Sequence, residues 1–154
     1  MPKAGLQFQK KDEYMTPKEV VDFFGPFEYD PATTDTQSAH LGIKNYDTIV
    51  TDGLKTDWSQ FDRIWVNPPF TRKFDFLKKA ICSGSHVFFL MPIESMVTSK
   101  FHKIMAGYGG GYTMWLPNGR IKFDDGSGRH SSPAFGSVVL ELYGKTKRVK
   151  HWSI

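Results

Sequence analysis

The sequence predicts a single α/β domain in which helices flank a largely parallel central sheet. Short apolar runs bounded by turn-forming residues alternate with segments of helical periodicity, which is the pattern of an α/β layer structure. The apolar run over residues 86–91, stopped by Pro92, is typical of a strand covered on both faces. With 154 residues, 40% of them hydrophobic, the chain has the size of one compact domain with one core.

The first half of the chain begins with residues 1–14, which are polar and mixed in charge, and we expect them to form a flexible N-terminal arm. A helix is predicted over residues 15–24, with Thr16 as its N-cap, Pro17 at the first helical position and Glu19 three residues after the cap. The next expected elements are a short strand, a loop or short helix, and a strand ending at Asp52-Gly53, over residues 27–29, 30–42 and 46–52.

The second half contains more strands than helices, so the sheet should end in a β-rich region. Strands are predicted over residues 61–66, 86–91, 112–116, 120–123 and 136–143. Helices are predicted over residues 74–81 and 95–105, where apolar residues recur at helical spacing. We therefore divide the chain into an arm (1–14), a globular domain (15–144) and a basic C-terminal tail (145–154).

Composition excludes several classes of protein. Cys82 is the single cysteine, so the chain can form neither an intramolecular disulfide nor a thiolate zinc cluster. The five histidines show no metal-ligand spacing, and we expect no metal site. No apolar run approaches the ~20 residues that span a bilayer, so a soluble, cytoplasmic protein without a membrane partner is expected. The net charge of +4 is compatible with a nucleic-acid partner.

Three polar groups follow predicted strands: Asp30, Asp52 and Asn67. Ligands of open parallel sheets bind beyond the carboxyl ends of the strands, so these groups are candidates for one site. For Asp30 and Asp52, each followed by a turn former, ordinary turns are the alternative. Asn67 precedes two prolines, which hold it out of the helical region and stiffen the backbone, and its amide is therefore suited to binding an exocyclic amino group.

The motif Asn67-Pro68-Pro69-Phe70 resembles the Asn-Pro-Pro-aromatic signature of S-adenosylmethionine-dependent amino methyltransferases. With Trp58 and other segments, it resembles the phage-encoded DNA N-6-adenine methyltransferase family over roughly residues 14–143. The other segments that carry this likeness are residues 16–23, 30–32, 51–54, 61–66, 119–123 and 133–137. The resemblance implies a Rossmann-like S-adenosylmethionine methyltransferase fold in a minimal single domain, acting in the cytoplasm of a bacterial host.

The resemblance also implies roles for individual residues. The catalytic residues would be Asn67, Pro68, Pro69 and Phe70, acting on an adenine of DNA that is flipped out or single-stranded. The residues that would bind the cofactor S-adenosylmethionine are Thr16, Asp30, Pro31, Ala32, Asp52, Gly53 and Leu54. One departure from the family is that Thr33-Thr34-Asp35 stands where the cofactor loop usually has glycines. Asp35 and Asp47 are both candidates for the acid that binds the ribose.

Two alternatives remain open at this point. The same motif could methylate another amino group, such as cytosine N4, an RNA adenine or a protein glutamine. The chain could instead be a catalytically silent module that binds DNA or a protein partner, and the glycine-poor loop favours this possibility. The sequence implies no particular oligomeric state.

Overall fold

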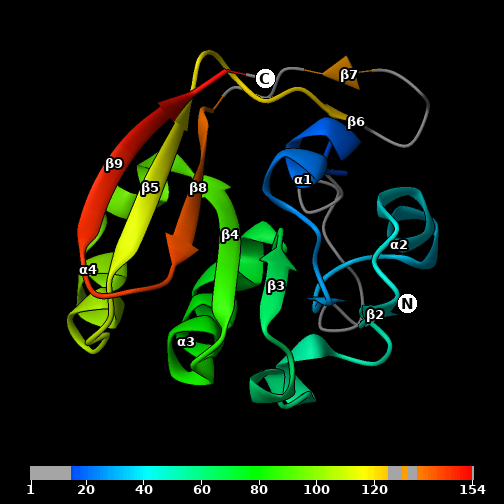
Figure 1. Ribbon diagram of the computed structural model, residues 1–154, viewed down its shortest axis with the longest axis horizontal. Coiled ribbons are helices and arrows are strands. Elements are labelled where there is room, and N and C mark those ends of the chain that lie inside the picture. Colours follow the sequence, from blue (N-terminus) through cyan, green and yellow to red (C-terminus); the bar gives the residue numbers. More distant parts are fainter. Residues whose placement is uncertain (1–14, 125–129, 132–134, 154) are drawn as a thin grey trace, which may run out of the picture.

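The computed structural model describes residues 15–124, 130–131 and 135–153, so the expected N-terminal arm lies outside the described residues. Seven strands form one sheet in the order β2-β1-β3-β4-β8-β5-β9 (Figure 1). Their bounds are Tyr29–Asp30 (β1), Asn45–Tyr46 (β2), Arg63–Val66 (β3), His86–Pro92 (β4), Tyr112–Pro117 (β5), Ser137–Leu142 (β8) and Lys147–Trp152 (β9). The strands β6 (Phe123–Asp124) and β7 (His130–Ser131) pair separately.

The sheet is largely parallel, as predicted. β2, β1, β3 and β4 run parallel to one another, and β9 runs parallel to β5. Only β8 is antiparallel to the strands on either side of it. From β1 the chain continues to β2 on one side and then crosses to β3 on the other, which is the strand reversal of a Rossmann-like α/β fold.

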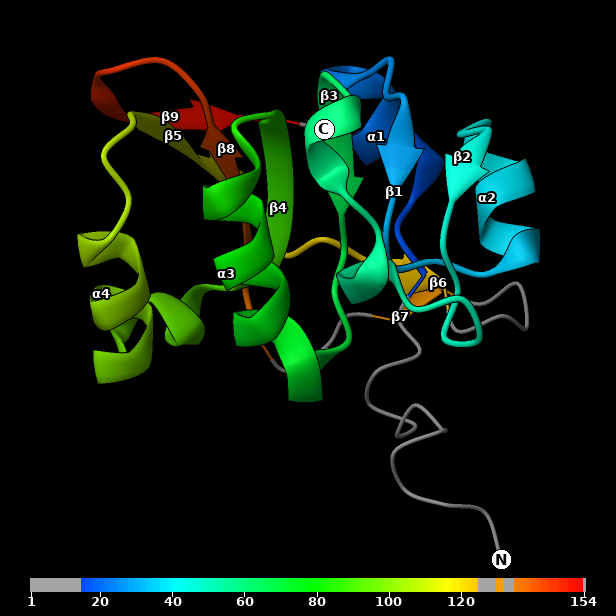
Figure 2. The same ribbon diagram turned by 90° about the horizontal axis from the view of Figure 1, so that it is seen from below.

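Helices cover both faces of the sheet and create two hydrophobic clusters. α1 (Lys18–Phe24) and α2 (Asp35–Leu41) contribute to one cluster, and α3 (Lys73–Ser83) and α4 (Ser99–Ala106) to the other. Figure 2 shows α3 and α4 together on one side of the sheet. Short 3-10 helices are Gly53–Lys55 (η3), Trp58–Gln60 (η4), Phe70–Arg72 (η5) and Ile93–Val97 (η6). Within the described residues, none of these helices has the length and apolarity needed to cross a bilayer.

Strand β4 confirms the prediction made from the apolar run over 86–91. Val87, Phe89 and Met91 enter the cluster beneath α3 and α4, whereas Phe88 and Leu90 enter the cluster beneath α1. Because successive side chains of a strand point to opposite faces, a strand buried on both faces needs an unbroken apolar run.

The first helix starts later than the sequence analysis predicted. Pro17, rather than Thr16, is the N-cap, and its carbonyl oxygen accepts from the Val20 N–H at 3.1 Å. The Thr16 hydroxyl makes no cap because it accepts a hydrogen bond from Asn67 instead. The N-cap prediction for Thr16 was therefore wrong, and the reason is a tertiary contact with a residue far away in sequence.

The prediction of a strand over residues 46–52 was also wrong, because only Asn45–Tyr46 pairs with β1. Two threonines turn the chain after it: Thr51 Oγ1 accepts from the Thr48 N–H at 2.9 Å, and Thr48 Oγ1 accepts from the Val50 N–H at 3.2 Å. Such local side-chain hydrogen bonds compete with a sheet ladder.

Two further elements are shorter than predicted. The helix expected over 95–105 is divided into η6 and α4, because the Thr98 hydroxyl accepts from the Phe101 N–H and caps α4 there. The strand expected over 120–123 contributes only its last residue to β6.

The basic tail predicted over 145–154 contains a strand and is not a separate tail. β9 pairs with β5 from Tyr112–Lys147 to Pro117–Trp152. Trp152 is buried in the cluster under α1, with its ring 5.1 Å from that of Phe24. Burial of this indole attaches the strand to the core. The sequence did not predict this attachment, because the residues before Trp152 are mostly basic.

Candidate active site

The site lies where the strand order reverses, at the carboxyl ends of β1 and β3. Tyr29 is in register with Ile64, so Asp30 ends β1 beside the segment in which β3 leads to Asn67. Figure 2 shows β1 and β3 side by side. A crevice beyond the carboxyl ends of strands at such a reversal is the usual ligand site of open α/β sheets.

The side-chain amide of Asn67 is held by Thr16. Asn67 Nδ2 donates to Thr16 Oγ1 at 2.9 Å, and the Thr16 backbone carbonyl accepts from Gln37 Nε2 at 2.9 Å. Thr16 and Gln37 are 3% and 6% exposed, so both hydrogen bonds are protected from water. The contact with Thr16 fixes the orientation of the amide, with its nitrogen toward α1.

The Asn-Pro-Pro-Phe motif forms a stiff turn that leads into α3. Pro68 and Pro69 are buried, and the Pro69 carbonyl accepts from the Arg72 N–H at 3.0 Å. Phe70 is half-buried and packs edge-on against Phe135, with ring centroids 4.9 Å apart. The motif thus places an amide and an aromatic ring in succession at the edge of the sheet.

Asp30 is a buried carboxyl group at the end of β1. It is 2% exposed, and its Oδ1 accepts from the Ala32 N–H at 3.0 Å. Burial raises the pKa of Asp30 to about 7, although the hydrogen bond from Ala32 acts in the opposite direction. Among the described residues no basic side chain forms an ion pair with it. A carboxyl that is buried without a counter-charge in a crevice is a candidate for binding a cationic group.

Asp52 and Gly53 reach the same region by a route that differs from the prediction. Asp52 does not end a strand: it has φ +59° and caps η3, and its Oδ1 accepts from the Leu54 N–H at 3.1 Å. Arg72 Nη2 lies 3.7 Å from that oxygen. Gly53 packs directly on Pro31, so that a Cβ at Gly53 would lie 2.0 Å from the Pro31 carbonyl oxygen.

A small hollow lies between the segment after β1, the segment around Asp52 and the start of α3. It is lined by Pro31, Ala32, Thr48, Ile49, Asp52, Gly53, Arg72 and Phe76. Four of the seven residues that we predicted to bind cofactor are in this lining. Leu54 is not, because its side chain packs against the hydrophobic cluster under α3. Asp30 ends β1 directly before this lining, and Thr16 is hydrogen-bonded to Asn67, which follows the neighbouring strand β3.

Three residues of this region were missed by sequence reasoning. Gln37 holds the Thr16 backbone, Arg72 faces Asp52, and Phe135 packs on Phe70. The sequence gives little signal for Gln37 and Phe135, which are far from their partners along the chain. Arg72 could have been found, because it comes two residues after Phe70.

The two candidates for a ribose-binding acid differ in their surroundings. Asp47 Oδ2 accepts from the Tyr29 hydroxyl at 2.5 Å and from the Thr56 hydroxyl at 2.6 Å. Burial raises the pKa of Asp47, but these hydrogen bonds outweigh it and lower the pKa. Asp35 is exposed and accepts from the Tyr46 hydroxyl at 2.6 Å. In the part of the chain that the structure describes, no group of His, Cys, Asp and Glu could hold a metal ion.

Comparison with known proteins identifies relatives. The family model for DNA N-6-adenine-methyltransferase (Dam) matches residues 3–147. A DNA N-6-adenine-methyltransferase of Escherichia phage T1 is 29% identical over 80 residues, which cover 49% of this chain and 32% of that protein. The aligned segment thus spans about a third of the length of this relative.

Solved structures give weaker matches. A predicted O-methyltransferase from Agrobacterium tumefaciens has a TM-score of 0.42 at 16% identity, covering 77% of this chain and 57% of that one. A proposed RNA methyltransferase from Pyrococcus horikoshii has a TM-score of 0.47 at 16% identity, covering 82% of this chain and 67% of that one. The assignment to a family therefore rests on the sequence match.

Proposed function

Because the chain belongs to the DNA N-6-adenine-methyltransferase (Dam) family, we propose that it transfers a methyl group from S-adenosylmethionine to the exocyclic N6 of adenine in DNA. One observation carries the proposal: the Asn67 amide is held by Thr16 at the carboxyl end of β3, next to a buried carboxyl and a hollow. This arrangement suits a reaction that depends on positioning an amino group beside a cofactor.

The residues at the strand ends fit the cofactor. S-adenosylmethionine, when bound, supplies an activated methyl on a sulfonium with a neutral thioether as leaving group, so the reaction needs no general acid. Asp30 is a buried carboxyl whose ionised form is disfavoured by burial and has no ion pair among the described residues, so a positively charged methionine end would supply the counter-charge that stabilises it. Thr16 accepts from Asn67 and still has its own O–H to donate, which suits the cofactor carboxylate.

The adenine end of the cofactor would be held at the hollow beside Pro31, Asp52 and Gly53. Gly53 lies so close to Pro31 that only a residue without a Cβ fits there, and this close packing gives the hollow its wall. The Asp52 carboxylate at that wall would accept from the cofactor amino group. The residues that we propose to hold the cofactor are Thr16, Asp30, Pro31, Ala32, Asp52, Gly53 and Leu54.

The substrate adenine would be positioned by the Asn-Pro-Pro-Phe turn. The Asn67 amide oxygen and the Pro68 carbonyl each accept one N–H of the adenine amino group, which drives that nitrogen toward tetrahedral geometry and directs its lone pair. Phe70 stacks on the base. Alignment of this kind supplies about 7–11 kcal/mol of a barrier when the reacting groups are held in line. A base inside a duplex cannot reach the turn, so the adenine must be flipped out or single-stranded.

The experiment that tests this function identifies the product. The protein is incubated with DNA and S-adenosylmethionine carrying a labelled methyl, and the DNA is digested to nucleosides for mass spectrometry. We expect labelled N6-methyladenine. Labelled N4-methylcytosine in its place would contradict the proposal, and label on RNA or on a protein glutamine alone would contradict it as well.

The silent binding module is tested by a second measurement. Thr34 Oγ1 accepts from the Gln37 N–H, so the segment after Ala32 begins a helix instead of forming a glycine loop. Calorimetric titration with S-adenosylmethionine separates the two functions. Binding supports the enzyme, and an absence of detectable binding at millimolar ligand would support the silent module.

A further inference from the structure

Strand β9 carries a set of basic residues that the proposed active site does not use. Lys147, Arg148, Lys150 and His151 are all exposed, and β9 contains no acidic residue. The family match ends at residue 147, so all of β9 after its first residue lies beyond the matched segment.

The pairing of β9 with β5 decides which of these residues share a face. Arg148 is opposite Thr113 and Lys150 is opposite Trp115, so Arg148, Lys150 and Trp152 point to the same side as Trp115. We call this side of β9, β5 and β8 the β9 face. Figures 1 and 2 show α3 and α4 on the opposite side. On the β9 face, Phe23 and Phe24 of α1 pack against Trp115 and Trp152, while Arg148 and Lys150 remain exposed.

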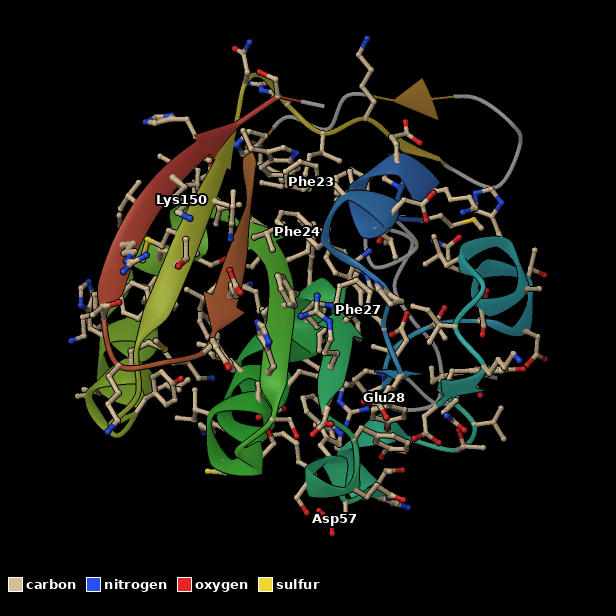
Figure 3. All side chains as sticks on the ribbon, in the orientation of Figure 1. Phe23, Phe24, Phe27, Glu28, Asp57 and Lys150 are labelled. Carbon is tan, nitrogen blue, oxygen red and sulfur yellow. The ribbon has the colours of Figure 1, made fainter. Side chains whose placement is uncertain are left out.

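The cations of the β9 face are not neutralised by the protein. Lys150 Nζ lies 5.1 Å from the centre of the Trp115 ring, and in Figure 3 this side chain projects from β9 on the side that also carries Phe23. No described carboxylate forms an ion pair with Arg148 or Lys150. Glu141, the acid on this face, is engaged by His86 at 2.6 Å and by the Trp115 indole N–H at 2.9 Å.

Exposed aromatic residues border the same face. Tyr143 is 63% exposed and stacks on His86, with ring centroids 4.1 Å apart. Phe23 is 51% exposed and stacks on Trp152, with centroids 5.7 Å apart. The surface is thus basic and aromatic, which is the character of a nucleic-acid interface.

We propose that the β9 face binds the phosphate backbone of the DNA duplex that flanks the target adenine, with Arg148 and Lys150 as the phosphate contacts. Along a strand these two residues are about 6.6 Å apart, which is close to the axial rise of about 6.8 Å over two nucleotide steps of one DNA strand. The inference rests on the proposed function, because it assumes that the catalytic edge takes an adenine from the same DNA.

The place of β9 in the sheet favours a contact with the flank over a contact with the target base. β9 is four strands from β3 in the sheet order, which corresponds to about 19 Å at the usual spacing. A cation at that distance cannot touch an adenine held by Asn67, but it can meet the backbone of a duplex that continues past the site.

An edge strand can also carry lysines merely to prevent association with the edges of other sheets. Measurement of DNA affinity against salt separates this role from phosphate binding. A labelled 30-base-pair duplex is titrated with the full chain by fluorescence anisotropy between 50 and 200 mM KCl. The test variant is Arg148→Gln/Lys150→Gln. The matched control is Lys100→Gln/Lys103→Gln, which removes the same charge from α4 on the opposite side of the sheet.

We expect the test variant to lower the slope of log Kd against log salt by about 1.8, because each phosphate contact contributes about 0.9. Over the fourfold range of KCl, this makes the loss of affinity about 12-fold smaller than for the wild type. The control should keep the wild-type slope, as should Arg148→Lys/Lys150→Arg, which preserves the charges. At saturating DNA the test variant should keep the wild-type rate of methyl transfer.

Several results would overturn the inference. They are an unchanged slope, an equal change in the control, an effect on a single-stranded 30-mer but not on the duplex, and self-association of the test variant with an unchanged slope. Failure of the proposed function is recognised separately, because a wild type that shows the salt effect but forms no N6-methyladenine refutes the activity and not the surface. Methyl transfer with an unchanged slope refutes the surface alone.

Discussion

Replacement of Asp30 by Asn tests the electrostatics of the site through protein stability. Burial raises the pKa of Asp30 from its ordinary 3.8 to about 7, so the ionised form is disfavoured in the folded protein. In the unfolded chain the carboxyl is already ionised above pH 4. Between pH 4 and pH 7 the folded state therefore binds more protons than the unfolded state, and stability must fall as the pH rises.

The size of the effect follows from the shift. Each pKa unit corresponds to about 1.36 kcal/mol, so a shift of about 3 units costs about 4 kcal/mol once the carboxyl is ionised in both states. Roughly 2–3 kcal/mol of this loss falls between pH 5 and pH 8. Asn keeps an oxygen that can accept from the Ala32 N–H but has no charge to bury, so Asp30→Asn should lack this component.

The assay is urea unfolding of the wild type and Asp30→Asn at several pH values from 5 to 8. The difference between the two proteins is the informative quantity, because the other titrating groups contribute equally to both. We expect the wild type to lose roughly 2–3 kcal/mol relative to the variant as the pH rises. Parallel pH profiles would show that Asp30 ionises normally and would refute the account of its burial.

Three other substitutions test contacts at the site and in β9. Thr16→Val leaves the Asn67 amide nitrogen without its acceptor, so we expect a loss of about 1–3 kcal/mol in urea unfolding and slower methyl transfer, both restored by Thr16→Ser. Gly53→Ala places a Cβ 2.0 Å from the Pro31 carbonyl oxygen, so the Tm and the cofactor affinity should fall, whereas Gly107→Ala, with its nearest atom at 3.5 Å, should change neither. Trp152→Ala empties a buried indole site and should cost about 3–5 kcal/mol in the same unfolding assay; a loss below about 1 kcal/mol would show that β9 does not depend on the core.

Much of the fold was predictable because its signals are local. The apolar run over 86–91 identifies β4, and the prolines after Asn67 mark the end of β3. Asp30 and Asn67 were placed at one edge of the sheet by one rule, that parallel strands bring their carboxyl ends to the same edge, and β1 and β3 are indeed paired in parallel.

The parts that escaped prediction depend on contacts between distant residues. The residues around Thr16 have the pattern of a helix N-cap, yet the Thr16 hydroxyl accepts a hydrogen bond from Asn67, 51 residues away. The run of Lys and Arg in residues 145–150 predicts a tail, but β9 pairs with the distant strand β5 and buries Trp152 in the core. Asp52 was placed at a strand end, but two threonine hydroxyls turn the chain before it, and it reaches Pro31 through the close packing of Gly53.

The measurement that tests the central claim most directly compares methyl transfer and cofactor binding in Asn67→Ala. If the Asn67 amide positions the adenine amino group, the rate of N6-methyladenine formation should fall at least about 100-fold, while the Kd for S-adenosylmethionine changes by no more than a few-fold. Asn118→Ala, at an exposed asparagine after β5, should match the wild type in both. Methyl transfer that survives in Asn67→Ala, or is lost together with cofactor binding, would contradict the account.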